Sequence, residues 1–207
     1  MAAKRRQTKS AGFRMRRRDS EFKPDAKVST WSKTYHLTAL QRLRLAKWLL
    51  YTATIILALV VQDVIMSQFS ILGGTTDLPV AVILLITVIE GTEVGSLFVL
   101  IASVLYYFSG TAPGAYSIGL MCILGIAAVM FRQLYWHRSK GSIVLCACIA
   151  LMGYELGLFV VGIFSELTTW NHFGNFLLTG IYACATVPVF YPLIYKIGQI
   201  GGNTWKE

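Results

Sequence analysis

Glu155 is the residue of this sequence whose charge would be the most costly to bury. It stands in the middle of an apolar run, Ile143–Phe164, where an ionised carboxylate costs several kcal/mol unless it is protonated, hydrated or paired. Three roles are open for it: a protonated or hydrogen-bonded packing residue, a group at an interface or pocket that contacts a partner chain, and a member of a transport or proton relay. Asp63, near one end of another apolar run, is placed for simple hydration.

The other residue types that carry chemistry are scattered along the chain. The 4 cysteines all stand in apolar runs without a C-x-x-C spacing, and the 3 histidines fall in a tail and in loops. We therefore expect no metal, no disulfide and no other cofactor, and the cysteines should pack as small hydrophobic residues. Catalysis inside a membrane usually needs clustered ionisable residues. No lysine, arginine or histidine stands inside an apolar run, so the sequence predicts a protein that is not an enzyme.

The composition is that of a membrane protein. Of the 207 residues, 55% are hydrophobic and only 14% are charged, whereas soluble domains carry about 25% charged residues. Runs of the length that a membrane-spanning helix needs recur along the chain: Trp48–Met66, Leu78–Phe108, Ala115–Phe131, Ile143–Phe164 and Phe176–Tyr195. These runs predict an all-α membrane protein.

The run Leu78–Phe108 is too long for one span, because a single helix of that length would measure roughly 46 Å against about 30 Å of hydrocarbon. The 19 lysines and arginines decide how it is divided, since such residues in short loops stay on the cytoplasmic side. A hairpin places all of them on that side, whereas a single span would expose the basic loop 132–140 outside. We therefore expect Glu90 and Glu93, with Gly91 between them, to form a tight cytoplasmic turn whose carboxylates reach water or headgroups.

The chain is then a six-helix bundle over residues 38–200, with a tail at each end. The predicted spans are 48–66, 78–89, 94–108, 115–131, 143–164 and 176–195. The outer connections 67–77, 109–114 and 165–175 contain no lysine or arginine. Both termini, including the short tail 201–207, should lie in the cytoplasm.

The N-terminal tail, residues 1–37, is basic and has few apolar residues, which is typical of a disordered segment. Its densest cluster comprises Arg14, Arg16, Arg17 and Arg18. Anionic lipids attract each such group by about 1 kcal/mol, so we expect this cluster to face the lipid surface. A specific site for a cytoplasmic partner is the alternative, and we expect no nucleic-acid partner.

Small residues recur at a spacing of four, which lets helix backbones approach closely in lipid. The two pairs are Gly91 with Gly95, and Gly153 with Gly157, which flank Glu155. They serve either packing within the chain or contact with a partner chain. Pro113 and Gly114, in an outer connection, are further candidates for a partner contact.

Several stretches together resemble the rod shape-determining protein MreD family. They are "ILGGTTDLPVAVILL" (71–85), "EGTEVGSLFVLIASVLYYFSGTAPGAYSIGL" (90–120), "YEL" (154–156) and "YPLIYKI" (191–197), and the likeness in order and spacing covers about residues 48–200. The resemblance implies a bundle related to the substrate-capture subunits (S-components) of energy-coupling-factor transporters. It also implies a role without catalysis in the bacterial plasma membrane: binding MreC, and with it RodA, its transpeptidase PBP2 and the MreB filaments, in cell elongation.

The alternative function is that of an S-component, which captures a small molecule for a vitamin transporter. Such subunits usually carry Ala-x-x-x-Ala in the first span for docking to the coupling protein. Here Ala53 and Ala58 are five residues apart, and only Thr54 and Ala58 have the spacing of four. The sequence therefore favours the elongation role over the transport role.

Overall fold

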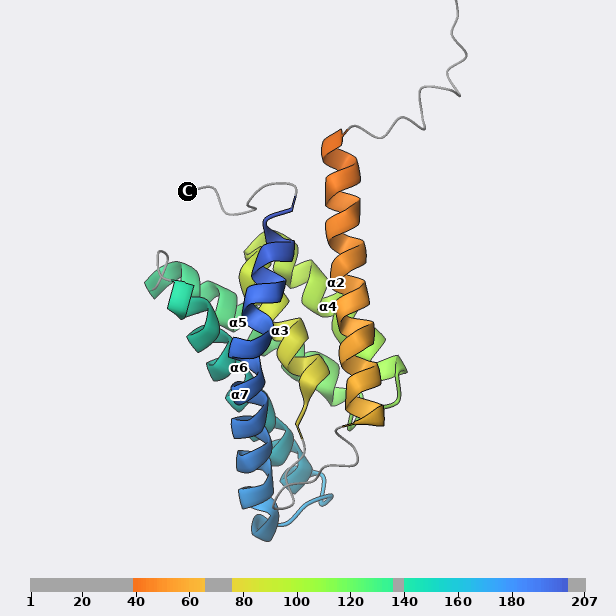
Figure 1. Cartoon of the computed structure of the whole chain (residues 1–207). Coiled ribbons are helices and arrows are strands. Elements are labelled where there is room, and N and C mark those ends of the chain that lie inside the picture. Colours follow the sequence, from red (N-terminus) through yellow and green to blue (C-terminus); the bar gives the residue numbers. More distant parts are fainter. Residues whose placement is uncertain (1–38, 66–75, 136–139, 201–207) are drawn as a thin grey trace, which may run out of the picture. The chain divides into compact units, whose positions relative to one another are not determined.

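Helices make up nearly all of the chain that the structure, a computed structural model, describes, namely residues 39–65, 76–135 and 140–200. In these ranges the long helices are α2 (Ala39–Val64), α3 (Leu78–Glu90), α4 (Thr92–Phe108), α5 (Tyr116–Tyr135), α6 (Lys140–Phe164) and α7 (Phe173–Gly198), with a short 3₁₀ turn, η2 (Trp170–His172), before the last (Figure 1). Four of them, α2, α5, α6 and α7, are long and apolar enough to cross a membrane, and α3 and α4 are shorter apolar helices. The prediction of an all-α membrane bundle is confirmed.

The predicted hairpin between residues 78 and 108 forms, and Gly91 makes its turn. Helix α3 ends at Glu90, and α4 begins at Thr92. Gly91 has a φ of 87°, a conformation that a residue with a Cβ adopts only under strain. Its N–H donates to the carbonyl oxygen of Thr87 at 3.2 Å. The chain can therefore reverse within one residue, and the apolar run is divided into two helices as the charge pattern predicted.

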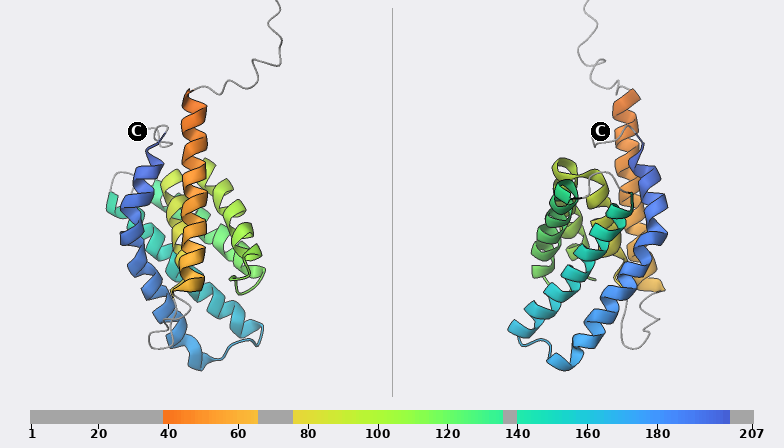
Figure 2. Two further views of the ribbon diagram at one scale, coloured as in Figure 1. Left: turned by 45° about the vertical axis from the view of Figure 1, so that its right-hand side comes forward. Right: turned by 90° about the vertical axis from the view of Figure 1, so that its left-hand side faces the viewer.

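Helix α3 is the centre of the bundle. All of its 13 residues are buried, and it contacts α2, α4, α5, α6 and α7. Figures 1 and 2 show it, in yellow, enclosed by the other helices. A helix of this length spans about 20 Å, less than the hydrocarbon thickness. Since α3 is surrounded by protein, its short length does not expose its polar ends to lipid.

The outward faces of the surrounding helices are apolar. Large hydrophobic side chains are exposed on each of them, among them Leu57, Leu100, Ile123, Val160 and Val189. A soluble protein rarely exposes so much contiguous apolar surface. In a membrane these faces meet lipid, which agrees with the composition.

The glycine pairs pack within the chain. A Cβ on Gly95 would overlap the carbonyl oxygen of Thr87, so α4 approaches α3 closely there. A Cβ on Gly153 would lie 3.2 Å from Leu124, and one on Gly157 would lie 2.9 Å from Leu120, both on α5. Gly95, Gly153 and Gly157 therefore lie at helix contacts within the chain, as the internal-packing alternative expects, and Gly153 and Gly157 also keep part of their surface exposed.

Candidate functional site

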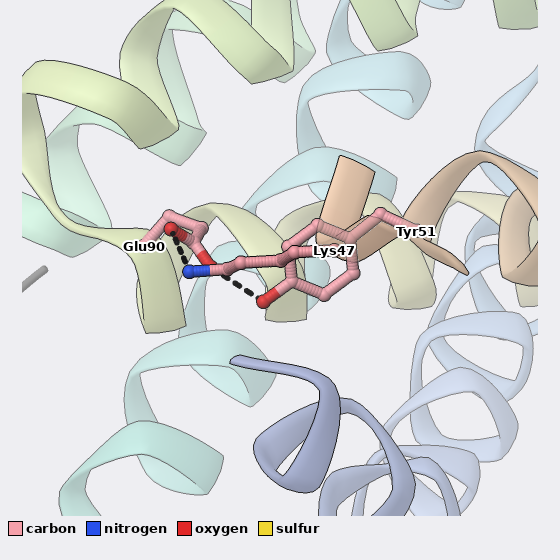
Figure 3. Close-up of polar contacts among 3 residues, drawn as sticks. All are labelled: Lys47, Tyr51 and Glu90. Atoms are coloured by element: carbon pink, nitrogen blue, oxygen red, sulfur yellow. Dashed lines mark hydrogen bonds and ion pairs between the residues drawn. The ribbon is translucent and has the colours of Figure 1, made fainter. Parts of the chain in front are cut away.

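Polar side chains gather at both ends of α3, and at its C-terminal end they form a buried ion pair. The Nζ atom of Lys47 lies 2.6 Å from Oε1 and 2.8 Å from Oε2 of Glu90. The hydroxyl of Tyr51 donates to Oε1 of the same carboxylate at 2.5 Å. Figure 3 shows the Lys47 and Tyr51 side chains side by side, both reaching Glu90. The three residues join α2 to the end of α3.

This arrangement corrects the prediction for Glu90. The residue is in the turn region as expected, but it is only 3% exposed, and Lys47 only 4%, so its carboxylate is neutralised by a lysine instead of by water or headgroups. Glu93, the second residue of α4, is exposed as predicted. Sequence reasoning missed Lys47 and Tyr51. Their spacing of four, which puts them on one helix face just before the apolar run, is the signal that could have indicated them.

Arg132 also belongs to this end of α3 and not to a loop. It was predicted to lie in a basic connection, but α5 continues through it and the residue is buried. Its Nη1 donates to the carbonyl oxygen of Val88 at 2.7 Å. The last carbonyls of a helix have no partner within the helix and carry its negative end. The guanidinium therefore caps α3 where a cation is most stabilising.

At the opposite, N-terminal end of α3 lies an open pocket of about 320 Å³. Its walls come from four helices and two connections. The lining residues are Gln62 of α2, Thr76 and Asp77 before α3, Tyr106 of α4, Thr111 and Pro113 after α4, Glu155 and Leu158 of α6, and Asn175, Phe176 and Thr179 of α7. Most of these residues carry polar groups, but apolar atoms form the larger part of the pocket surface, so the pocket suits a partly apolar molecule that also makes hydrogen bonds.

Asp77 is held in place by its neighbours. The Tyr106 hydroxyl donates to its two carboxylate oxygens at 3.1 and 3.4 Å. The side-chain oxygen of Gln62 accepts from the backbone N–H of Leu78 at 3.2 Å, which satisfies a donor at the start of α3 that the helix itself leaves unpaired. Burial raises the pKa of Asp77 to about 6, and the hydrogen bond from Tyr106 opposes that rise.

Glu155 faces this pocket from α6. The residue is 3% exposed, and its Oε1 has no hydrogen-bond partner among the groups that the structure describes. Helix α7 covers it closely at Gly180, where a Cβ would lie 3.4 Å from Glu155 Cγ. Among the predicted roles of Glu155, that of a group in a pocket agrees with this position. Asp63, in contrast, is exposed near the end of α2, as hydration requires.

The remaining candidates are Pro113, Gly114 and the arginines of the tail. Pro113 is exposed and lines the pocket rim, and Gly114 follows it. The four arginines of the tail lie outside the described residues. Within the described ranges the four cysteines are free and no cluster of three metal-ligating side chains occurs.

No protein-family model matches the chain, and comparisons with curated proteins and with solved structures found no match either. The likeness to MreD, and through it to S-components, therefore stays a prediction from the sequence.

Proposed function

We propose that this chain is a non-enzymatic integral membrane component of the bacterial cell-elongation machinery. In this role it binds an MreC-like single-span protein in the plasma membrane and helps organise peptidoglycan synthesis with RodA, PBP2 and MreB. Both of its termini lie in the cytoplasm, and the basic tail rests on anionic lipid. The observation that carries the proposal is the ordered likeness to the MreD family over about residues 48–200.

Three landmarks of that likeness fall at helix junctions, and a fourth contains a buried acid, which supports the proposal of a shared architecture. The "TDLP" stretch (76–79) leads into α3, and "EGTE" (90–93) is the turn between α3 and α4. The "SGTAPG" stretch (109–114) joins α4 to α5. The "YEL" stretch (154–156) contains the buried Glu155. Each quoted stretch thus coincides with a feature that shapes the bundle.

The partner surface in this proposal differs from the one that the glycine spacing first suggested. Because Gly95, Gly153 and Gly157 pack against α3 and α5, we expect the partner to contact outward faces of the bundle. Pro113 remains a candidate, since it is exposed in the connection between α4 and α5.

Purification from native membranes in mild detergent tests the proposal. We expect an MreC-like single-span protein to co-purify with the chain, and depletion of the chain to make a rod-shaped host round up. Co-purification of ATP-binding-cassette subunits in place of an MreC-like protein, with the cell shape unchanged on depletion, would contradict the adaptor role.

The second candidate is the S-component function, capture of a small molecule for a vitamin transporter. The specific observation in its favour is the pocket of about 320 Å³ with its polar lining. The same purification separates the two, because a capture subunit should be recovered with its transporter subunits and a stoichiometric vitamin-sized ligand.

A further inference from the structure

We propose that the pocket at the N-terminal end of α3 binds a small organic cation, a molecule with a protonated amine on a compact apolar body. The inference does not rest on the elongation role, since it follows from the charge, the unpaired atoms and the size of the pocket. Asp77 and Glu155 are its two acidic groups, and they stand on walls contributed by different parts of the chain.

The ionisable groups of the lining that could carry charge near neutral pH are all acidic. The lining contains two carboxylates, and no lysine, arginine or histidine is among the described residues that form it. At the other end of α3 the buried Glu90 has Lys47 as a counter-ion, whereas Glu155 has no such partner within the described ranges. A buried carboxylate is costly unless it is paired or neutralised. A bound cation would supply at this end the positive charge that the chain supplies at the other.

Unpaired polar atoms point to the same occupant. Glu155 Oε1 and Thr76 Oγ1 are buried without a hydrogen-bond partner in the part of the chain that the structure describes. Buried polar groups are paired in the great majority of cases, so each exception needs an explanation. An ammonium group has several N–H donors and no acceptor. It can donate to Glu155 and to Asp77, whose oxygens keep further lone pairs beside the bond from Tyr106.

The size of the pocket favours an organic molecule over a bare ion. A water molecule occupies about 30 Å³ of liquid, so a monatomic cation would leave most of the roughly 320 Å³ unfilled. The described residues also hold no cluster of three metal-ligating side chains. The rings of Phe176 and Tyr106 and the side chain of Leu158 offer apolar and cation–π contacts to the body of an organic cation.

A charge series on the unmodified protein tests the inference without depending on any variant. The probes are benzylammonium, benzyl alcohol and benzoate, which share a ring and differ in charge, and binding is measured by titration calorimetry of the purified chain in lipid nanodiscs. We expect benzylammonium to bind about tenfold or more tightly than either comparator. Equal binding of the alcohol, or no binding of the ammonium compound, would overturn the proposal.

Matched variants assign the binding to the pocket. Glu155→Gln and Asp77→Asn each replace one carboxyl group by an amide of almost the same shape, and each should weaken benzylammonium binding about tenfold. Glu93→Gln makes the same replacement at an exposed position near the other end of α3, and this variant should bind like the unmodified protein. If one pocket variant fails to fold, the other still tests the assignment. Unchanged affinity in a folded pocket variant would contradict it.

This result is separable from the proposed function. Co-purification of an MreC-like protein is measured on the same Asp77→Asn sample. Loss of benzylammonium binding with retention of the partner supports the cation site whatever the chain's role, and failure to recover an MreC-like partner from the unmodified chain bears on the elongation role alone.

Discussion

The side chain of Glu90 is charged and buried, and two residues of one helix turn fix its position. Lys47 and Tyr51 are four residues apart on α2, so they present one face to the end of α3. Lys47 neutralises the carboxylate, and Tyr51 donates a further hydrogen bond to it. A buried pair of this kind adds little net stability over an apolar replacement, but removing one partner leaves an uncompensated charge. Its main effect is to specify how α2 docks on α3.

The ion pair gives a prediction that a double-mutant cycle can check. Lys47→Met should destabilise the folded chain by about 3–5 kcal/mol, because it leaves Glu90 buried without its counter-ion. Adding Glu90→Gln should restore much of the loss. The measurement is the free energy of unfolding in detergent. Arg44→Met, an exposed change one turn away on α2, is the control, and equal losses in the single and double variants would contradict the pairing.

Asp77 predicts how stability depends on pH. Burial raises the pKa of this carboxyl from 3.8 to about 6, so between those values the folded chain holds more protons than the unfolded chain. The Asp77 contribution should therefore lower the free energy of unfolding as pH rises from about 4 to about 6. Tyr106, which donates to Asp77, and Glu155, across the pocket, are the titratable groups of the same lining.

Thermal unfolding midpoints across this pH range, measured for the unmodified chain and for Asp77→Asn, check the prediction. The difference between the two profiles removes the contribution of groups that titrate alike in both chains. We expect the unmodified chain to gain stability relative to the variant as the pH is lowered through about 6. Parallel profiles would show that Asp77 does not titrate in this way.

At the scale of elements, the close approach of α4 to α3 depends on Gly95. A Cβ there would overlap the carbonyl oxygen of Thr87, and backbone cannot move aside as a flexible side chain can. Gly95→Ala should therefore destabilise the chain by about 1–3 kcal/mol and lower its abundance in membranes. Gly119→Ala in α5 is the control. A Cβ on Gly119 meets nothing within 4 Å, and alanine should leave stability unchanged or raise it by up to about 1 kcal/mol.

The two variants are compared by thermal unfolding in detergent and by the amount of chain in membranes. A partner-binding role for Gly95 would reduce association with another chain while stability stayed normal. Normal stability of Gly95→Ala would thus contradict the packing role that the structure gives this residue.

The helices themselves could be predicted from the sequence, because hydrocarbon thickness and the placement of charges allow only a few ways of dividing the chain into membrane spans. The hairpin in the run Leu78–Phe108 followed from its length and from the lysines and arginines of distant loops. The exact ends did not follow. Helix α5 continues through Arg132, and that side chain caps α3. This is a tertiary contact between residues 44 positions apart, for which the local sequence carries no signal.

The candidate site was less predictable for the same reason. Glu155 stood out alone, since a carboxylate in the middle of an apolar run is conspicuous in any context. Its neighbours in the pocket, such as Asp77, Thr111 and Asn175, are ordinary polar residues near the ends of helices. Only the fold brings these residues together around one pocket. Their spacing along the chain therefore could not show that they belong to the same site. The sequence did show one feature that these neighbours share: they lie in, or next to, the predicted outer connections.

At the scale of the whole molecule, the charges separate the two ends of the bundle. Lys47 and Arg132 lie at the C-terminal end of α3, and Lys196 is in the last turn of α7. The described residues of the outer connections carry no lysine or arginine. Short basic segments are retained on the cytoplasmic side during insertion. The end with the ion pair should therefore face the cytoplasm, and the pocket should open to the outside.

Cysteine labelling of intact cells tests this orientation, in a background whose four native cysteines are replaced. Ser165→Cys lies in the connection after α6 and is exposed, so a membrane-impermeant maleimide should label it. Thr92→Cys, at the turn between α3 and α4, should be labelled only after the cells are permeabilised. The positive-inside rule requires this difference, since a reversed bundle would place the basic connection after α5 outside. Labelling of Thr92→Cys in intact cells would show the opposite orientation. The pocket would then open toward the cytoplasm, and its ligand would have to come from there.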